Sequence, residues 1–479
     1  MSDLAYMTAS EAIERFTART LSPVELMEAV IARAEAVEPT VNALCFRCND
    51  EALAAAHAAE DRYMGKGEAP RPLEGIPTAI KDEMPIAGQP WTMGSLIFKD
   101  LVAEESSPLA QRIIDSGAIV HARTTTPEFS CAGFTKSHIH GVTRNPWNPE
   151  FAVGGSSGGS GASLASGTST LAGGSDIGGS IRIPAGFNGV VGFKAPHGRV
   201  PVEPPFNLDR YCHNGGLART VEDMRLFENV LAGPHPMDHT SLRPKLEIPA
   251  DLAGIEGMRI ALCPDLGCFP LDPEVDRNTR DAAQALRDAG AIIEEVSLDL
   301  KHADIERAAA IHFAAIFGAW IGGMVDEHRE IMTDHAIVFA EHMRRLAGDE
   351  LPVYEGLELE AAIWNPLAAV LETHEALLCA TNGTRGLVAD DEYADHGLTV
   401  GGRKLPFYFE AILTPVFNIA SACPVLNVPS GFADNNVPTG LQIVGRTFDD
   451  VTTFRIGAAL ERMRPWLDAP ERRPLQGAV

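Results

Sequence analysis

The chain has 479 residues, with 65 acidic side chains against 39 basic ones, which gives a net charge of −26 and a pI near 4.9. This balance argues against nucleic acid or an anionic membrane as a direct partner, because phosphate groups are bound by Lys and Arg. At 45% hydrophobic and 22% charged residues, the composition is that of a globular protein large enough to enclose an active site.

The cysteine and histidine patterns do not predict a metal or redox centre. Of the eight cysteines only Cys45 and Cys48 form a close pair, and a single C-x-x-C motif without a second half is weak evidence for zinc or redox chemistry. We therefore expect unpaired thiols. His121, His138 and His140 lack a further ligand at a spacing known for metal sites. No metal and no cofactor is expected.

The N-terminal region predicts helices. Its first residues, MSDLAYMTASEAIERF, contain no basic segment followed by an apolar one, so we expect no secretory signal and a cytoplasmic location. Capping boxes at Thr8 and Ser22 begin two helices, the second of which is expected to end at Glu38–Pro39. An alanine-rich run, Ala52–Met64, predicts a third. We expect residues 1–70 to form a helical layer.

The rest of the chain, residues 71–479, predicts alternating helices and strands. A helix followed by a buried strand is expected within residues 108–122, and a strand–helix–strand unit within residues 259–296. Tightly turned strands follow at residues 414–445, and a closing helix at residues 449–463. This alternation is typical of an α/β fold.

One segment, Ala308–Val325, carries no formal charge over 18 residues, which is the lower edge of membrane-span length. Alanine and glycine are its commonest residues, so we expect a buried helix beside a pocket and not a membrane span. Phe313, Phe317 and Trp320 would then form aromatic walls of that pocket.

The densest collection of glycine and hydroxyl side chains lies between Gly154 and Arg182. A flexible linker is disfavoured because apolar residues are interleaved, and a phosphate-binding loop because no Gly-Lys-Ser/Thr ending is present. A serine-hydrolase site, with backbone N–H groups beside an activated hydroxyl, fits better. Ser157 is the centre of a G-x-S-x-G pattern, but only Phe151–Val153 precedes it where a nucleophile elbow needs a strand.

Two blocks of the sequence resemble the amidase signature family. The first contains GGSSGGSGASLASG and GGSDIGGSIRIPAGFNGVVGFK, and the second is GIPTAIKD at residues 75–82. The catalytic set of that family is a nucleophilic serine, a serine held through a cis peptide bond, and a lysine. Carried over position by position, the resemblance implies Ser180 as the nucleophile, Ser156 as the bridging serine and Lys81 as the base.

The resemblance also implies a fold, because it runs over most of the chain. That fold is α/β, with a mixed central β-sheet covered by helices on both faces. The likeness is tight over residues 75–95 and 154–200 and loose from 300 to 410. We therefore expect one catalytic core over residues 71–479, in which residues 300–410 form the substrate-pocket region.

A lysine serves as a base near pH 7 only when its amine is neutral. Lys81 follows Ala79 and Ile80 in an apolar strand, where burial would lower the pKa of its amine. Alternation along the strand turns Asp82 to the opposite face, so Asp82 need not hold the lysine charged. In the implied relay Lys81 takes a proton from Ser156, which takes one from the nucleophile.

Residues around the nucleophile have expected supporting roles. The candidate oxyanion hole is formed by the backbone N–H groups of Ile177, Gly178, Gly179 and Ser180. Asp176 and Arg182 flank the nucleophile, and they either pair across it and hold the loop or form an ordinary surface pair. Ser157 is expected to support the bridging serine.

We expect a stand-alone amidase that hydrolyses a neutral, apolar aryl or alkyl carboxamide or anilide, or a carbamate. The loose region offers aromatic side chains, but no Arg or Lys lies between Arg307 and Arg329 to bind a substrate carboxylate. Arg182, which flanks the nucleophile, is the remaining candidate partner for a substrate carboxylate, unless it already pairs with Asp176.

Two other functions stay open at this point. The glutaminase-type catalytic subunit of a tRNA-dependent amidotransferase shares the signature and passes ammonia to a partner, and the acidic balance disfavours it unless other subunits bind the RNA. A catalytically inactive binding protein is disfavoured by the intact Lys81, Ser156 and Ser180. The expected partner is a small-molecule amide, with neither nucleic acid nor membrane, and a homodimer stays open.

Overall fold

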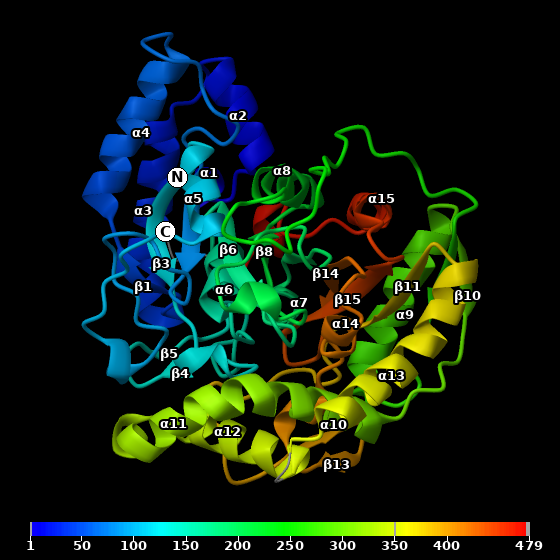
Figure 1. Ribbon diagram of the computed structural model, residues 1–479. Helices are drawn as coiled ribbons and strands as arrows, with labels where there is room; N and C mark the ends of the chain where they lie inside the picture. The colour runs from blue at the N-terminus through cyan, green and yellow to red at the C-terminus, as the bar shows by residue number, and fades with distance from the viewer. Residues whose placement is uncertain (1, 349–350, 476–479) are drawn as a thin grey trace.

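The computed structural model describes residues 2–348 and 351–475. One sheet of 11 strands runs through the molecule (Figure 1). Its strands are β1 (Leu44–Arg47), β2 (Pro77–Lys81), β3 (Ile119–Thr124), β6 (Leu171–Asp176), β7 (Val191–Lys194), β8 (His213–Ala218), β9 (Arg259–Leu262), β10 (Ile292–Glu295), β11 (Ala376–Ala380), β14 (Val425–Phe432) and β15 (Pro438–Gly445). The short strands β4 (Lys136–Ser137), β5 (Gly141–Val142), β12 (Leu398–Val400) and β13 (Arg403–Leu405) form two small separate pairs.

The sheet is mixed. Its strand order is β1-β3-β2-β6-β8-β7-β14-β15-β11-β9-β10. Strand β2 is parallel to β3 and β6, and β9 is parallel to β10 and β11. The other neighbouring pairs are antiparallel.

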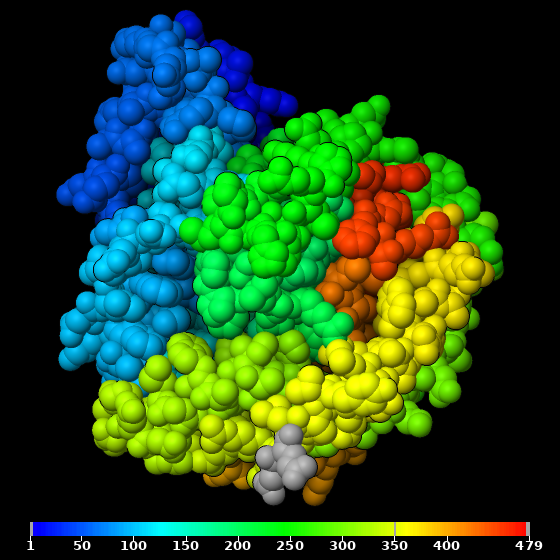
Figure 2. Space-filling view, in the orientation of Figure 1, coloured from blue at the N-terminus to red at the C-terminus, as the bar shows by residue number. Residues whose placement is uncertain are grey.

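Helices surround this sheet. They are α1 (Ser2–Ala5), α2 (Ala9–Thr17), α3 (Pro23–Val41), α4 (Asn49–Tyr63), α5 (Pro108–Asp115), α6 (Gly158–Ser166), α7 (Arg182–Asn188), α8 (Val221–Leu231), α9 (Pro273–Asp288), α10 (His302–Phe313), α11 (Ala319–His328), α12 (Asp334–Ala347), α13 (Val353–Thr373), α14 (Val416–Ile419) and α15 (Asp450–Met463). In the space-filling view, the yellow-green segment that contains α11 and α12 forms the lower edge of the molecule, beneath the green central segment (Figure 2).

The two faces of the sheet carry separate apolar cores, because successive side chains of a strand point to opposite sides. In β9, Ile260 and Leu262 belong to one core and Ala261 to the other. Helices α5, α8, α9 and α15 contribute to the first core, whereas α10 to α13 belong to the second and α6 and α7 pack on Ala172 and Leu217. The expected α/β fold, a mixed sheet with helices on both faces, is confirmed.

The structure corrects two expectations for the N-terminal region. Residues 1–70 are not wholly helical, because β1 joins the edge of the main sheet antiparallel to β3. Helix α3 also continues past Glu38–Pro39 to Val41, where Asn42 takes a left-handed φ of 55° and donates its N–H to the Glu38 carbonyl. The burial of Val37 and Val41 favours this last turn in spite of the proline, and Asn tolerates the left-handed cap.

Two predicted units are found where they were expected. Strand β9, helix α9 and strand β10 form the βαβ unit, with Arg259 opposite Ile292 in a parallel pair. Strands β14 and β15 pair antiparallel, and α15 begins one residue after the predicted start at residue 449.

The apolar segment Ala308–Val325 is not one regular helix. It contains the end of α10, a π-helical turn at Ala314–Gly318 and most of α11. The helical run His302–Ile331 is long and apolar enough to cross a membrane, but 61% of its most apolar window is buried inside the protein. A core helix has this pattern, and π-turns within helices often lie near functional sites.

Candidate active site

Lys81 lies at the end of β2, where its side chain is completely buried. Its Nζ donates to Ser156 Oγ at 2.6 Å and to Ser175 Oγ at 2.9 Å, and lies 2.5 Å from Glu83 Oε2. These contacts join the lysine block to the glycine-rich block, which is 75 residues away in sequence. The predicted partners Lys81 and Ser156 therefore meet directly.

Two effects act on the pKa of Lys81. Burial lowers it, and the nearby Glu83 carboxylate opposes that shift through its charge and its hydrogen bond. Burial alone would raise the pKa of Glu83, but the Lys81 charge and the hydroxyls of Ser175 and Ser130 lower it below its ordinary value. Glu83 therefore stays ionised, and Lys81 releases its proton more easily than an exposed lysine.

The sequence analysis considered Asp82 as the carboxylate next to Lys81 and did not identify Glu83. Asp82 faces away from the lysine, as alternation predicts, and accepts hydrogen bonds from the N–H groups of Thr92 and Gly94. The same alternation places the second residue after Lys81 on the lysine side. That spacing was the available signal for Glu83. Ser175, the residue before Asp176, had no such signal, because only tertiary pairing brings it to Lys81.

Ser156 and Ser157 have different environments. The Gly155–Ser156 peptide bond is cis, and the Ser156 hydroxyl accepts from Lys81. Ser157 is fully buried, and its Oγ donates to the Ser175 carbonyl at 3.2 Å. Its N–H donates to the Ser180 carbonyl at 3.1 Å, which holds the two serine loops together. The Ser157 side chain is thus hydrogen-bonded to strand β6 and has a supporting role in the site.

The loop between β6 and α7 is clamped by one carboxylate. Asp176 Oδ1 accepts from the Gly179 N–H at 2.8 Å, and Oδ2 accepts from the Ile181 N–H at 3.3 Å. Ser180 lies between these two bonds and keeps 7% of its surface accessible. The carboxylate of Asp176 therefore fixes the backbone on both sides of the candidate nucleophile.

This clamp corrects the expected oxyanion hole. The N–H of Gly179 is engaged by Asp176, so it does not point at an incoming carbonyl. Gly179 serves the loop through its φ of 120°, and a Cβ there would lie 1.9 Å from Thr414 Oγ1. The remaining candidate donors are the N–H groups of Ile177, Gly178 and Ser180. Thr414 also donates to the Gly178 carbonyl at 2.6 Å, which orients the Gly178–Gly179 peptide.

Arg182 is buried and pairs with Asp176, so the pair is not a surface one. Its Nε and Nη2 reach the two Asp176 oxygens at 2.9 Å each. The other donors reach the Thr414 carbonyl, Gln442 Oε1 and Asn418 Oδ1 at 3.0, 2.8 and 2.7 Å. All five N–H groups of the guanidinium are therefore used within the protein. Arg182 has none left for a substrate carboxylate.

The three expected pocket aromatics lie at different depths. A Cβ on Gly178 would lie 3.2 Å from the ring atoms of Phe313 and of Phe409, so these two rings cover the Ser180 loop. The ring of Phe317 packs against that of Phe313, with ring centroids 6.1 Å apart. The side chain of Trp320 is partly exposed and packs against Phe129 in a T-shaped arrangement, with ring centroids 5.3 Å apart. In the sequence Phe409 is one of several aromatic residues within 345–410 that are candidate pocket walls, and no local pattern singles it out.

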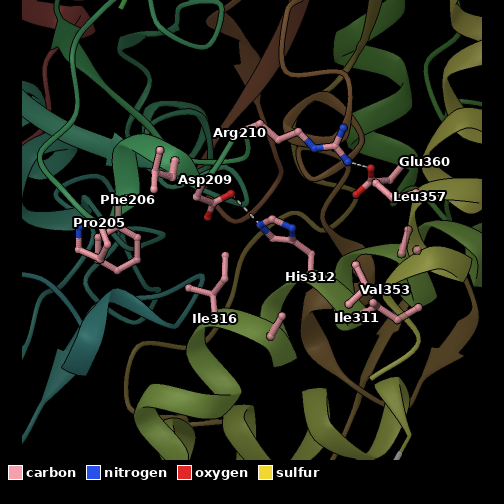
Figure 3. Close-up of a pocket in the computed structure, with 14 residues that line it drawn as sticks. Pro205, Phe206, Asp209, Arg210, Ile311, His312, Ile316, Val353, Leu357 and Glu360 are labelled. Atoms are coloured by element: carbon pink, nitrogen blue, oxygen red, sulfur yellow. Dashed lines mark ion pairs between the residues drawn. The ribbon is translucent and has the colours of Figure 1, made fainter. Parts of the chain in front are cut away.

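A cleft of about 550 Å³ lies beside this region, between residues 205–210, α10 and α13 (Figure 3). In it His312 lies 2.8 Å from Asp209, and Arg210 pairs with Glu360. Neither the lysine nor the two catalytic serine candidates line this cleft. It is therefore a neighbouring feature and not the catalytic recess.

Two groups of possible metal ligands occur among the described residues. Cys45, Asp82 and His140 form one, and His302, Glu306 and Glu410 form the other. The three histidines that the sequence brought together do not converge. Buried His121 lies within β3, where desolvation lowers its pKa to about 4. Neither group contains a residue of the Lys81–Ser156 network.

Comparison with known proteins places this chain among amide-hydrolysing enzymes. The family model Amidase matches residues 25–454. A glutamyl-tRNA(Gln) amidotransferase subunit of Chloroflexus aurantiacus is 31% identical, over 97% of this chain and 98% of its own length. The acylamidase of Rhodococcus erythropolis is 30% identical, over 97% of both chains.

The fold gives the same result. The crystal structure of a bacterial aryl acylamidase of the amidase signature family superposes with a TM-score of 0.89 at 30% identity. The match covers 98% of this chain and 99% of that one. The chain therefore belongs to the amidase family, the amidase signature enzymes, and is a hydrolase of amide C–N bonds.

Proposed function

We propose that this chain is a stand-alone amidase that hydrolyses neutral, apolar aryl or alkyl carboxamides or anilides, or carbamates, through an acyl-enzyme on Ser180. The observation that carries this proposal is the buried Lys81–Ser156 hydrogen bond of 2.6 Å next to the clamped Ser180 loop. A serine is a weak nucleophile at its free pKa, and this bond supplies the base that it needs.

In the proposed reaction Lys81 accepts a proton from Ser156, and Ser156 accepts one from Ser180 as the Ser180 oxygen attacks the amide carbon. The backbone N–H groups of Ile177, Gly178 and Ser180 stabilise the negative charge on the carbonyl oxygen. Ser156 then protonates the leaving amine as the C–N bond breaks. A water molecule, deprotonated through the same relay, hydrolyses the ester and restores the serine.

The hydrogen bonds that Arg182 makes within the protein favour a substrate without a carboxylate. Its five donors are bound to Asp176 and to three other residues, Thr414, Asn418 and Gln442. A carboxylate placed near Ser180 would therefore lose its hydration without gaining a guanidinium partner, which is costly. The rings of Phe313 and Phe409 over the loop favour an apolar group instead.

The alternative is the glutaminase-type catalytic subunit of a tRNA-dependent amidotransferase, and the similarity to the Chloroflexus aurantiacus protein favours it. That assignment needs partner subunits for contacts to RNA, since this chain has a net charge of −26.

A cytoplasmic location is also part of our proposal. Its support is that the eight cysteines are free thiols, as expected in a reducing compartment.

The test uses the chain purified alone. We expect it to hydrolyse a neutral aryl amide with a kcat/KM at least tenfold above that for an acidic amide of similar size. Hydrolysis only in the presence of other subunits would favour the amidotransferase. A preference for the acidic amide would contradict the substrate assignment while leaving the amidase activity in place.

A further inference from the structure

A second carboxyl group lies near the lysine on the same face of the sheet. Ser175 of β6 is directly opposite Asn214 of β8 in an antiparallel pair, so their side chains point to the same side. Ser175 Oγ donates to Glu83 at 2.6 Å, and Asn214 Nδ2 donates to Glu203 Oε2 at 3.0 Å. The Glu203 carboxyl is therefore held one strand further along the surface that carries Glu83 and Lys81.

Glu83 and Glu203 are both accessible to solvent. The Glu83 side chain keeps 29% of its surface accessible, and Glu203 is also partly exposed. Burial nevertheless raises the pKa of Glu203 to about 7, with a smaller effect from the charge of Glu83. Burial raises the pKa of the Cys212 thiol, and the charges of Asp209, Glu83 and Glu203 add to that shift.

Three cations of this region, Lys81, Arg182 and Arg210, are already paired. Lys81 lies 2.5 Å from Glu83, and Arg182 uses all five donors inside the protein. Arg210 pairs with Glu360 in the neighbouring cleft (Figure 3). Glu203, in contrast, has the neutral amide of Asn214 as its side-chain partner, besides a backbone hydrogen bond, within the part of the chain that the structure describes. An ionised Glu203 therefore carries a negative charge that no cation named here balances.

We propose that Glu203 faces the bound substrate and determines which substrate charge the enzyme accepts: the site takes an amide that carries an ammonium group on its distal end and rejects one that carries a carboxylate. An ammonium group neutralises Glu203 through a charge-assisted hydrogen bond. A carboxylate is repelled by the charge of Glu203, and Lys81, Arg182 and Arg210 are not free to pair with it. The inference rests on the proposed function and extends its neutral substrates to cationic ones.

The test measures binding separately from turnover. Three benzamides of matched shape are titrated into the Ser180→Ala variant by calorimetry at pH 8, where Glu203 is ionised: 4-(aminomethyl)benzamide, 4-methylbenzamide and 4-carbamoylbenzoate. We expect the cationic compound to bind at least tenfold more tightly than the neutral one, and the anionic compound to bind most weakly. Equal affinities, or no binding of the cationic compound, would overturn the proposal.

The double variant Ser180→Ala, Glu203→Gln assigns the effect. Gln retains an acceptor for Asn214 but not the charge, so the ratio between the cationic and neutral compounds should fall to within about twofold. Glu360→Gln in the same background is the matched control, because Glu360 is a buried carboxylate of the neighbouring cleft. A ratio that falls equally in both variants contradicts a specific role of Glu203. If the active enzyme hydrolyses none of the three compounds, the proposed function fails, and the binding ratios still decide the role of Glu203.

Discussion

The amine of Lys81 is subject to two opposing effects, and their balance decides whether it can act as a base. Complete burial favours the neutral amine, while the Glu83 carboxylate at 2.5 Å favours the ammonium ion. A buried lysine without a partner would be neutral but poorly oriented. The contact with Glu83 holds the amine against Ser156 and leaves its pKa below that of an exposed lysine.

The first prediction concerns Glu83→Gln. Removing the carboxylate removes the effect that raises the pKa of Lys81, so the pKa falls further. Because the base must be neutral, kcat/KM increases with pH through the pKa of Lys81, and this rise should move to lower pH. The plateau should drop about tenfold, which corresponds to the loss of one charge-assisted hydrogen bond of roughly 1.5 kcal/mol. The measurement is the pH profile of kcat/KM.

Asp82→Asn is the control for that profile. Asp82 is the adjacent carboxylate, but its hydrogen bonds go to Thr92 and Gly94. Its replacement should leave the position of the rise unchanged, whatever it does to stability. If the rise keeps its position in Glu83→Gln, Glu83 does not control the base.

The second prediction separates the two serines that a sequence pattern could name as the nucleophile. Ser180→Ala should abolish turnover and covalent labelling by a serine-reactive phosphonate, because Ser180 lies on the partly accessible loop. Ser157→Ala should still be labelled, since the Ser157 hydroxyl is buried against the Ser175 carbonyl. Mass spectrometry of the labelled peptide identifies the residue, and a label on Ser157 would contradict the assignment.

At the scale of elements, the site depends on how closely two backbones approach. Gly159 of α6 shows this, since a Cβ there would lie 2.5 Å from the Thr125 nitrogen and 2.6 Å from the Ala43 carbonyl oxygen. Glycine is a poor helix former, yet only glycine lets α6 pack this closely on the sheet. The helix is fully buried and supports the turn that presents Ser156.

The third prediction tests the same principle at Gly179→Ala. The added Cβ would lie 1.9 Å from Thr414 Oγ1, and the φ of 120° disfavours any side chain. The loop must shift, which moves the oxyanion donors. We expect kcat to fall by about 10² or more, as when a donor of an oxyanion hole is lost. Gly65→Ala is the control, because Gly65 has φ 77° with no atom within 4 Å; normal kcat in Gly179→Ala would refute this role of Gly179.

At the scale of the whole molecule, Arg182 joins segments that are far apart in sequence. Its guanidinium connects Asp176 of β6 with Thr414, Asn418 of α14 and Gln442 of β15. Burial alone would raise the pKa of Asp176, but Arg182 holds it below its ordinary value. The resulting stabilisation is present above the unfolded pKa of about 3.9 and is lost as the pH falls below it.

The fourth prediction follows for Arg182→Lys. A lysine keeps the charge but cannot bind all four residues at once, so buried acceptors lose their partners. We expect a loss of about 3 kcal/mol or more in the free energy of unfolding at pH 7, as for a broken buried pair. Arg280→Lys, in an exposed pair with Asp276, should cost under about 1 kcal/mol. Denaturant unfolding measures both, and equal losses would contradict the structural role of Arg182.

Local sequence patterns determined much of the fold. The capping box at Ser22, the strand–helix–strand unit from Arg259 to Glu295 and the strands β14 and β15 were predicted because their signals lie within a few residues. Two motif blocks identified the family and named Lys81, Ser156 and Ser180, because the chemistry needs those residue types in those blocks.

Tertiary structure decided what local patterns could not. The burial of Val37 and Val41 kept α3 helical past Pro39, and close packing made a helix of the glycine-rich α6. Gly179 looked like an oxyanion donor until the fold turned its N–H toward Asp176. Ser175 came to Lys81 through the sheet. The reason is physical: a sequence carries the preferences of single residues, whereas hydrogen-bond partners and buried charges are set by segments that meet only when the chain has folded.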